Sequence, residues 1–417
     1  MNRTSIITAA ALTLTAAGLL FAGPLDPPAG PVTSTYKTLT EVEPRIAINL
    51  TNTPGDADSV FKITQAGSYY LTGNINPVFA VKHGIEIAAS GVTLDLMGFD
   101  LVGTGLSLDG VSATVVGLTN ITIRNGSVRN WGDDGIDLGT NLAINSAIVD
   151  VRASNNVGDG IRAGKTGTVA GCKAYNNNGY GIDVRHGSTI TSCSADENSN
   201  IGMSAGDGCA IIGCTAYNNT GIGITTGSGC SIHSSSAFLN SAIGISTSSN
   251  CTITTCTASD NAGNGIATGA ACMISGCSAS SNTGNGIFGN IGSTISHCKA
   301  QSNTLDGIRV IADSMVLANS CDSNGLIGDG AGIHATLANN RIEGNNCTGA
   351  DRGIDVDTSG NIIIKNTCSN NTTNWTIVAN NVVGPILDRR APASAAINGD
   401  SAPDSTGSTH PNANFTY

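Results

Sequence analysis

The sequence predicts an all-β solenoid in which short strands from successive coils stack in parallel. The first observation is a run of glycines that recur every 21 residues from Gly160 to Gly307, each followed by Ile or Met. The second is that apolar or small residues stand at offsets 1, 7, 9, 12 and 14 from each glycine, partly with the period-two spacing of strands. A fixed period of this length is the signature of a solenoid, because each coil buries its apolar side chains only against its neighbours.

Three short strands joined by turns account for each coil better than other repeat units. No stretch holds the spacing of an amphipathic helix, Leu is too rare for a leucine-rich repeat, and 21 is not a multiple of six, as a left-handed hexapeptide helix would require. All 11 prolines lie at or before Pro77 or at or after Pro385, so none interrupts a central ladder.

One turn of the coil carries Asn at offset 17 in every strict repeat. Because Asn tolerates a left-handed backbone and bonds nearby main chain, we expect a turn ladder with amides hydrogen-bonded between coils. Outlying glycines at Gly84, Gly110, Gly135, Gly332 and Gly353 extend the pattern to 13 coils of 21–26 residues. The ladder residues are Asn177, Asn198, Asn219, Asn240, Asn261, Asn282, Asn303 and Asn324.

The Asn ladder, the stacked small and β-branched columns and the coil length resemble the right-handed parallel β-helix of the pectate-lyase-like superfamily. The segment from Phe61 to Leu101 resembles the opening of secreted bacterial right-handed β-helix repeat proteins. The resemblance covers roughly residues 60–385 and implies a right-handed parallel β-helix of about 13 coils. That architecture hosts lyases, hydrolases, epimerases, adhesins and inert scaffolds, so it leaves the function open.

The ends of the chain predict export. Residues 1–22 have the short basic start and apolar run of a secretory signal peptide, and no later stretch is long enough to span a membrane. We expect a linker and N-terminal cap over 23–59, the β-helix over 60–388 and a flexible C-terminal tail over 389–417, whose last four residues could also pack back or act as a sorting tag. The protein is therefore expected to be secreted, extracellular or on the cell surface; its oligomeric state is left open.

All 13 cysteines fall in columns of the repeat. We expect them to be buried as small apolar fillers, with occasional disulfides between neighbouring coils as the alternative. A metal site would need clustered ligands such as C-x-x-C, and the sequence has none.

The formal charge of −11 and the pI near 4.8 argue against a nucleic-acid partner, which needs a basic face. An anionic polysaccharide would also be repelled unless a local Arg/Lys patch or Ca²⁺ intervened. We expect no cofactor, with Ca²⁺ as the one candidate ion, and a polysaccharide or cell-surface glycan as the partner.

The candidate catalytic residues lie where the coils are longer. Asp109, Asp134 and Asp159 each precede a framework glycine on successive coils, Asp133 stands beside Asp134, and Arg162 is the candidate charge stabiliser. Stacked carboxylates of this kind share a proton, bind a cation or act as an acid/base pair. The alternative is ordinary turn chemistry, since Asp before Gly is common in turns.

Other charged and aromatic residues could contact a substrate. The four remaining histidines of the coils, at 83, 233, 297 and 334, share no column and are interpreted as surface or turn residues. The aromatic candidates share an outward column and could stack on sugar rings. The candidate substrate-binding residues are Asp137, Asp183, Arg185, His186, Tyr175, Tyr217 and Phe238.

Motifs of known β-helix enzymes are incomplete here. Gly132-Asp133-Asp134 resembles the Asp-Asp motif of polygalacturonases, but their Gly-His-Gly and Arg-Ile-Lys motifs are absent, as are the pectate-lyase Arg-x-Pro-x-x-Arg signature and the nonapeptide of calcium β-rolls. The first hypothesis is therefore a non-catalytic extracellular or surface glycan-binding rod. The alternatives are a polysaccharide lyase or glycoside hydrolase that uses the Asp cluster, and a structural spacer or adhesin.

Overall fold

The computed structural model describes residues 43–76, 81–139, 143–325, 328–391, 406 and 408–417. The described residues from 45 onward belong to one compact unit, and of the residues before it only 43 and 44 are described. The predicted signal peptide and much of the predicted linker and cap lie outside the described residues.

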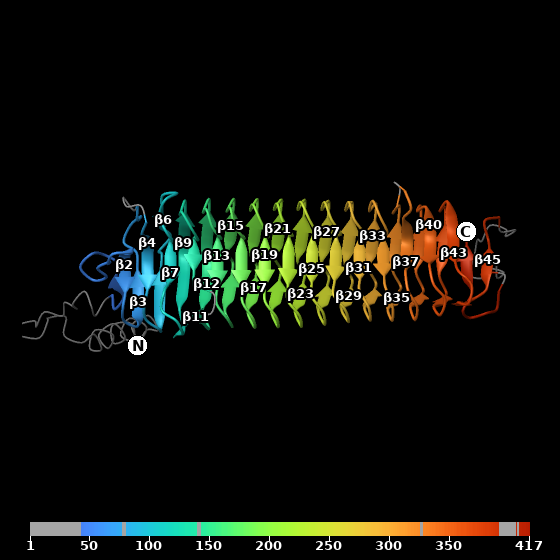
Figure 1. Ribbon diagram of the computed structural model, residues 1–417, viewed down its shortest axis with the longest axis horizontal. Helices are drawn as coiled ribbons and strands as arrows, with labels where there is room; N and C mark the ends of the chain where they lie inside the picture. The colour runs from blue at the N-terminus through green and yellow to red at the C-terminus, as the bar shows by residue number, and fades with distance from the viewer. Residues whose placement is uncertain (1–42, 77–80, 140–142, 326–327, 392–405, 407) are drawn as a thin grey trace, which may run out of the picture. The chain divides into compact units, whose positions relative to one another are not determined.

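The coils stack their strands in register along two parallel sheets (Figure 1). The 15-stranded sheet receives one strand from each coil and carries the framework glycines at or just before its strands. Its members, in order, are β2 (Ser59–Ile63), β4 (His83–Ile87), β7 (Val111–Ala113), β10 (Ile136–Asp137), β13 (Ile161–Ala163), β16 (Ile182–Val184), β19 (Met203–Ala205), β22 (Ile224–Thr226), β25 (Ile245–Thr247), β28 (Ile266–Thr268), β31 (Ile287–Gly289), β34 (Ile308–Val310), β37 (Ala331–Ala335), β40 (Arg352–Val356) and β43 (Thr373–Ile377).

The 29-stranded sheet has two arms that join at the long strands β9 (Thr122–Arg129) and β12 (Ala147–Ser154). A separate pair is formed by β8 (Leu118–Thr119) and β11 (Ala143–Ile144). The first arm holds β1 (Ile46–Ala47), β3 (Gly67–Tyr70), β5 (Val92–Asp95), β14 (Thr168–Ala170), β17 (Thr189–Thr191), β20 (Ala210–Ile212), β23 (Ser231–His233), β26 (Thr252–Thr254), β29 (Met273–Ser275), β32 (Thr294–Ser296), β35 (Met315–Leu317), β38 (Arg341–Glu343), β41 (Ile362–Ile364) and β44 (Val382–Val383). The second arm holds β6 (Asp100–Val102), β15 (Lys173–Tyr175), β18 (Ser194–Asp196), β21 (Thr215–Tyr217), β24 (Ser236–Phe238), β27 (Thr257–Ser259), β30 (Ser278–Ser280), β33 (Lys299–Gln301), β36 (Ser320–Asp322), β39 (Asn346–Thr348), β42 (Thr367–Ser369), β46 (Asn414–Thr416) and β45 (Ile386–Asp388).

This architecture confirms the predicted parallel β-helix of three short strands per coil, with no helix among the described residues. It has about 16 turns, three more than the 13 counted from the glycines. The first and last strands of the 15-stranded sheet lack the framework glycine, because Val60 and Asn374 stand at the places that face Gly84 and Gly353. A count of glycines therefore misses one coil at each end of this sheet, which accounts for two of the three additional turns.

Close packing explains why the framework position is glycine in the other coils. A Cβ added at Gly223 would lie 2.6 Å from Asn240 Nδ2 and 2.7 Å from the carbonyl oxygen of Gly244. The next residue, Ile224, is fully buried, as are its counterparts along the sheet. The repeat thus places a backbone contact and a core side chain side by side in every coil.

The predicted Asn ladder is confirmed. Asn219 Nδ2 donates to Asn240 Oδ1 at 3.0 Å and to the carbonyl oxygen of Ala195 at 2.9 Å, and the Asn219 backbone N–H donates to the same Oδ1 at 3.1 Å. These amides are buried, so each bond satisfies a group that water cannot reach.

All thirteen cysteines are buried free thiols, as the filler interpretation predicts. Ten of them, from Cys172 to Cys298, also donate to a main-chain carbonyl oxygen, which the sequence did not reveal. The Cys209 backbone N–H donates to Cys230 Sγ at 3.2 Å, and the Cys230 thiol donates to the carbonyl oxygen of Gly206 at 3.1 Å. Ser188 occupies the same column, so a hydroxyl and a thiol are interchangeable there.

The C-terminus returns to the solenoid. Strand β46 pairs in parallel with β42 and β45. Asn414 Oδ1 accepts from the Asn366 backbone N–H at 2.9 Å, which extends a second column of stacked Asn residues, Asn319, Asn345 and Asn366, that continues the column of Cys298. Most of the expected tail, residues 392–405 and 407, lies outside the described residues. Within the described ranges, no helix is long and apolar enough to span a membrane.

Candidate functional site

Consecutive strands β4, β7, β10, β13 and β16 gather charged side chains on the outer face of the 15-stranded sheet. Two columns supply most of them: the residue just before the framework glycine and the residue two places after it. We call this group the N-terminal charged centre. Its members are His83, Asp109, Asp133, Asp134, Asp137, Asp159, Arg162 and Asp183.

The first column uses one carboxylate oxygen of each residue to cap the next coil. Asp109 Oδ1 accepts from the Asp134 backbone N–H at 3.1 Å, and Asp134 Oδ1 accepts from that of Asp159 at 2.6 Å. Asp159 Oδ1 accepts from the Tyr180 backbone N–H at 2.7 Å. The turn chemistry that the sequence offered as an alternative is therefore present in the structure.

The second oxygen of each carboxylate faces a cationic or titratable side chain. Asp134 Oδ2 lies 3.0 Å from Arg162 Nη1, and Asp159 Oδ2 lies 2.6 Å from Arg162 Nη2. Asp109 Oδ2 lies 3.2 Å from His83 Nδ1. Hence one guanidinium bridges two coils, and His83, interpreted from the sequence as a dispersed surface residue, is part of the centre.

Burial changes the protonation of this centre. Burial raises the pKa of Asp134 to about 8, and the neighbouring carboxylate of Asp159 adds to the rise despite the opposing effect of Arg162. Burial likewise raises the pKa of Asp137 to about 6. The raised pKa favours the protonated form of Asp134, which is the form that a general acid requires.

Asp133 is the exposed member of the cluster. Asp109, Asp133 and Asp134 each offer a carboxylate oxygen, and these oxygens lie within 4.8 Å of one another. Oxygen-only sets suit hard cations such as Ca²⁺.

The predicted substrate-binding residues divide between two places. Asp137 and Asp183 flank Arg162 in register on β10 and β16, and Arg185 Nη2 reaches Asp183 Oδ2 at 3.5 Å. His186 lies in the exposed turn after β16, where its Nδ1 accepts from the Asp207 backbone N–H at 2.9 Å. The first three thus belong with the carboxylate cluster.

The aromatic candidates lie on the other sheet. Tyr175 ends β15, Tyr217 ends β21 and Phe238 ends β24, all in the second arm of the 29-stranded sheet. The rings of Tyr217 and Phe238 stack with their centroids 5.5 Å apart, whereas Asp196 separates Tyr175 from Tyr217 in the register. The structure does not bring these rings together with the carboxylates.

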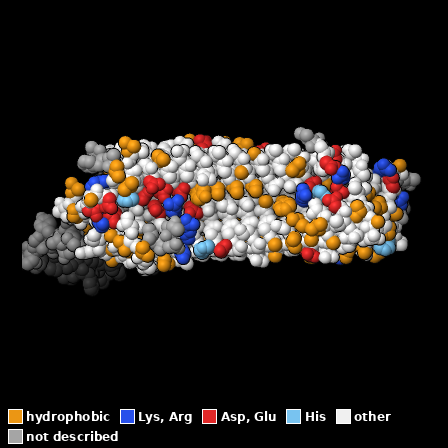
Figure 2. Space-filling view, in the orientation of Figure 1, with side chains coloured by type: hydrophobic (Ala, Val, Ile, Leu, Met, Phe, Trp, Pro, Cys, Tyr) orange, Lys and Arg blue, Asp and Glu red, His pale blue; other side chains and the backbone are white. Residues whose placement is uncertain are grey.

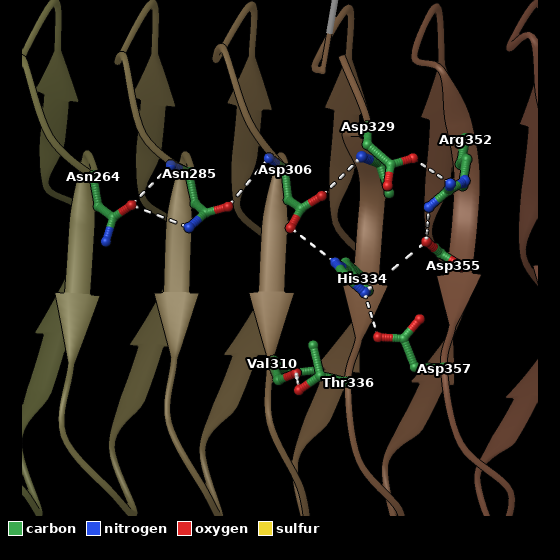
Figure 3. A network of polar contacts seen from close by, with 11 residues as sticks. Asn264, Asn285, Asp306, Val310, Asp329, His334, Thr336, Arg352, Asp355 and Asp357 are labelled. Carbon is green, nitrogen blue, oxygen red and sulfur yellow. Dashed lines mark hydrogen bonds and ion pairs between the residues drawn. The ribbon is translucent and has the colours of Figure 1, made fainter. Parts of the chain in front are cut away.

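A second charged centre, which the sequence reading missed, lies further along the same face (Figure 3). His334 on β37 is its middle: Nδ1 lies 3.0 Å from Asp306 Oδ2, and Nε2 lies 3.0 Å from Asp357 Oδ2 and 3.9 Å from Asp355 Oδ2. Burial lowers the pKa of His334, but the bonds to Asp306 and Asp357 outweigh it and raise that pKa to about 9. We call the group the C-terminal charged centre; its members are Asp306, Asp329, His334, Arg352, Asp355 and Asp357.

A sequence signal for this centre did exist. Asp306 precedes Gly307, as Asp134 precedes Gly135, and His334 stands two places after Gly332, as Arg162 does after Gly160. The 25-residue step from Gly307 to Gly332 hides the column from a count by 21. Counting from each framework glycine would have aligned it.

Between the two centres, the same two columns form an amphipathic strip. Half-buried apolar residues continue the first column, and hydroxyl residues continue the second, in register from β16 to β25. Figure 2 shows a line of hydrophobic side chains running between two groups of charged ones on this face. The strip consists of Tyr180, Ile201, Ile222 and Ile243 beside Ser204, Thr225 and Ser246.

Comparison with known proteins places the fold in a family. A family model described as the right handed beta helix region matches residues 81–237 and 199–292, together just over half of the chain. No curated protein matches the sequence.

Three solved structures show the range of similar proteins. The A-module of the Azotobacter vinelandii mannuronan C-5 epimerase AlgE6 aligns at 16% identity with a TM-score of 0.45, over 76% of this chain and 90% of that one. The periplasmic alginate epimerase AlgG aligns at 10% identity with a TM-score of 0.39, over 77% and 81%. The Dettilon tailspike protein gp208 aligns at 11% identity with a TM-score of 0.38, over 76% and 62%.

Proposed function

This chain belongs to the right-handed β-helix family, and we propose that the outer face of its 15-stranded sheet binds an extended glycan. The observation that carries the proposal is the amphipathic strip between two charged centres on one regular sheet. The strip repeats the same pair of groups, one apolar and one hydroxyl, on the three successive coils that carry Ile201, Ile222 and Ile243.

The chemistry of a sugar ring fits such a strip. A pyranose presents apolar C–H groups on its faces and hydroxyls at its rim, so the line that includes Ile201 and Ile222 would cover the first while Ser204 and Thr225 bond the second. Parallel strands repeat at roughly 4.8 Å, so a regular polymer meets regularly placed partners. The net charge of −11 favours a neutral or cationic glycan over a polyanion.

In this first form the protein is a non-catalytic extracellular or surface rod. The test is a panel of soluble neutral, cationic and anionic polysaccharides, measured by isothermal titration calorimetry with and without Ca²⁺. Ile222→Asp should abolish binding, because it places a charge in the middle of the apolar line. Ile212→Asp is the matched control, since Ile212 is 41% exposed on β20 of the other sheet. Absence of binding by the wild type, or equal loss in both folded variants, would contradict the proposal.

The raised pKa of Asp134 favours a second candidate, cleavage of the bound glycan by a lyase or glycoside hydrolase. A protonated carboxyl can donate to a leaving oxygen, and Arg162 can stabilise developing negative charge. Asp134 is only 2% exposed, so a substrate would approach it across the exposed Asp133. New reducing ends or unsaturated products that disappear in Asp134→Asn, while binding persists, would support cleavage over the non-catalytic form.

A further inference from the structure

We infer that His334, Asp355 and Asp357 bind a divalent transition-metal ion, and that Asp306 is the positioning residue that turns His334 toward it. The site belongs to the C-terminal charged centre and does not depend on the glycan proposal. Figure 3 shows the imidazole between Asp306 on one side and the two other carboxylates on the opposite side.

The ligand atoms have the spacing of a coordination sphere. His334 Nε2 lies 3.0 Å from Asp357 Oδ2 and 3.9 Å from Asp355 Oδ2, and the three ligand atoms lie within 4.8 Å of one another. Ligands held at about 2.1 Å from one ion are roughly 3.0–3.4 Å apart in octahedral or tetrahedral geometry. The edge between Nε2 and Asp357 already matches, and the 49% exposed side chain of Asp357 can adjust its distance to Asp355. The edge between Nε2 and Asp355 Oδ2, at 3.9 Å, must shorten by about 0.5–1 Å on binding.

Asp306 supplies one oxygen more than the backbone cap in this column requires. Asn264 and Asn285 precede their framework glycines in the same column, and each caps the next coil through its amide oxygen. Asp306 Oδ1 does the same for the Ala331 backbone N–H at 2.8 Å. An Asn here would also cap the coil, so the added function of Asp is its Oδ2, which accepts from His334 Nδ1 and leaves Nε2 to face the other carboxylates.

The local charge calls for a cation. Four carboxylates, those of residues 306, 329, 355 and 357, stand near two guanidinium groups. Arg352 pairs with Asp329 and Asp355, and Arg309 lies beside His334 in register. The four carboxylates and two guanidinium groups leave a formal charge of minus two before the imidazole is counted, which one divalent ion balances when it binds in place of an imidazole proton.

The N-terminal charged centre supplies its own cation in the equivalent place. Arg162 stands two residues after its framework glycine and reaches two carboxylates with its guanidinium. His334 occupies that position in the C-terminal charged centre, where its Nε2 faces Asp355 and Asp357. One imidazole nitrogen with carboxylate oxygens suits Mn²⁺ or Zn²⁺, whereas Ca²⁺ and Mg²⁺ take oxygen ligands.

Mn²⁺ is the probe of choice, because thirteen thiols could capture Zn²⁺ in any opened chain but bind Mn²⁺ poorly. The full chain, first dialysed against a chelator, is titrated with MnCl₂ and followed by calorimetry and electron paramagnetic resonance. We expect the wild type to bind one equivalent of Mn²⁺ and to show spin-echo modulation from an imidazole nitrogen. We expect His334→Gln and Asp357→Asn to lose this equivalent. Asp306→Asn keeps the hydrogen bond to the Ala331 backbone N–H, and we expect it to weaken Mn²⁺ binding by about 10–100-fold relative to the wild type.

Two controls separate this site from others. His186→Gln alters an exposed His–Asp pair in another coil, and Asp134→Asn alters the other carboxylate cluster; both should keep the same Mn²⁺ equivalent and its nitrogen signal. Circular dichroism checks that each variant is folded. The inference is overturned if the wild type binds no Mn²⁺, which would leave His334 as an imidazolium paired with its carboxylates, or if folded His334→Gln retains the full stoichiometry.

Discussion

The change Asp134→Asn isolates the charge of the N-terminal charged centre from its structural role. Asn285 shows that an amide in this column caps the next coil, because its Oδ1 accepts from the Asp306 backbone N–H at 3.1 Å. Asn at 134 can therefore keep the bond to the backbone of Asp159. It replaces the titrating oxygen that faces Arg162 by an uncharged amide NH₂, which cannot accept a hydrogen bond from the guanidinium.

The expected effect is on the pH dependence of stability. Burial raises the pKa of Asp134 from 3.8 to about 8, so between these values the folded state holds a proton that the unfolded state has lost. The contribution of this carboxyl to stability is thus fully present below about pH 4 and is lost as the pH rises through about 8. A shift of about four units at about 1.4 kcal/mol each sets an upper limit of ~6 kcal/mol. Because neighbouring carboxylates share the site, we expect Asp134→Asn to recover about 1–3 kcal/mol of that loss at pH 8.

The assay is urea denaturation of the wild type and Asp134→Asn at pH 5 and pH 8. The change in the free energy of unfolding between the two pH values is compared across the proteins. Asp260→Asn, at an exposed turn after β27, is the matched control for losing one charge. The wild type and the control should lose stability over this interval, and Asp134→Asn should lose less. Equal losses in all three proteins would refute the reasoning, since the proton would then not reside on Asp134.

Three further predictions concern the solenoid itself. Gly244→Ala should cost about 1–3 kcal/mol in denaturation experiments, because the new Cβ would lie 2.6 Å from Asn261 Nδ2 and 2.7 Å from the carbonyl oxygen of Gly265. Ile253→Asp places a charge at a fully buried position and should cost more than about 4 kcal/mol, splitting or unfolding the rod; an unchanged circular dichroism melt would contradict the assigned register. The thirteen buried thiols should react with a thiol reagent only after denaturation, and rapid labelling of the native chain would contradict their burial.

The fold was predictable because its restraints repeat. Each framework glycine marks the same close approach of two backbones, each Ile after it marks the same core position, and each Asn at offset 17 makes the same hydrogen bonds. Agreement over many coils therefore outweighs the ambiguity of any single coil. The prediction ended early only where the marker changed, at Val60 and Asn374. Those terminal coils keep the strand pairing without the glycine.

The candidate sites were predictable only in part. A shared position in the repeat predicts which side chains stack on neighbouring coils, but it does not predict how deeply they are buried. The stacking of Asp109, Asp134 and Asp159 followed from their shared position before glycine. The raised pKa of Asp134 did not, since it depends on burial, which residue type and spacing do not give. The C-terminal charged centre joins residues from three coils, and the sequence analysis missed it because it interpreted His334 as a dispersed surface or turn residue.

The distribution of Asn and Asp within one column carries a physical rule for this protein. The cap needs a single oxygen, and Asn264 and Asn285 supply it where the neighbouring outward positions hold Ala267 and Phe288. Asp appears where a second oxygen has a partner on the sheet face, as at Asp134, Asp159 and Asp306. A buried carboxylate is costly compared with an amide that makes the same cap, so its use at these places alone indicates a requirement beyond folding. For that reason the Asp-to-Asn variants at 134 and 306 test function with the least disturbance of the solenoid.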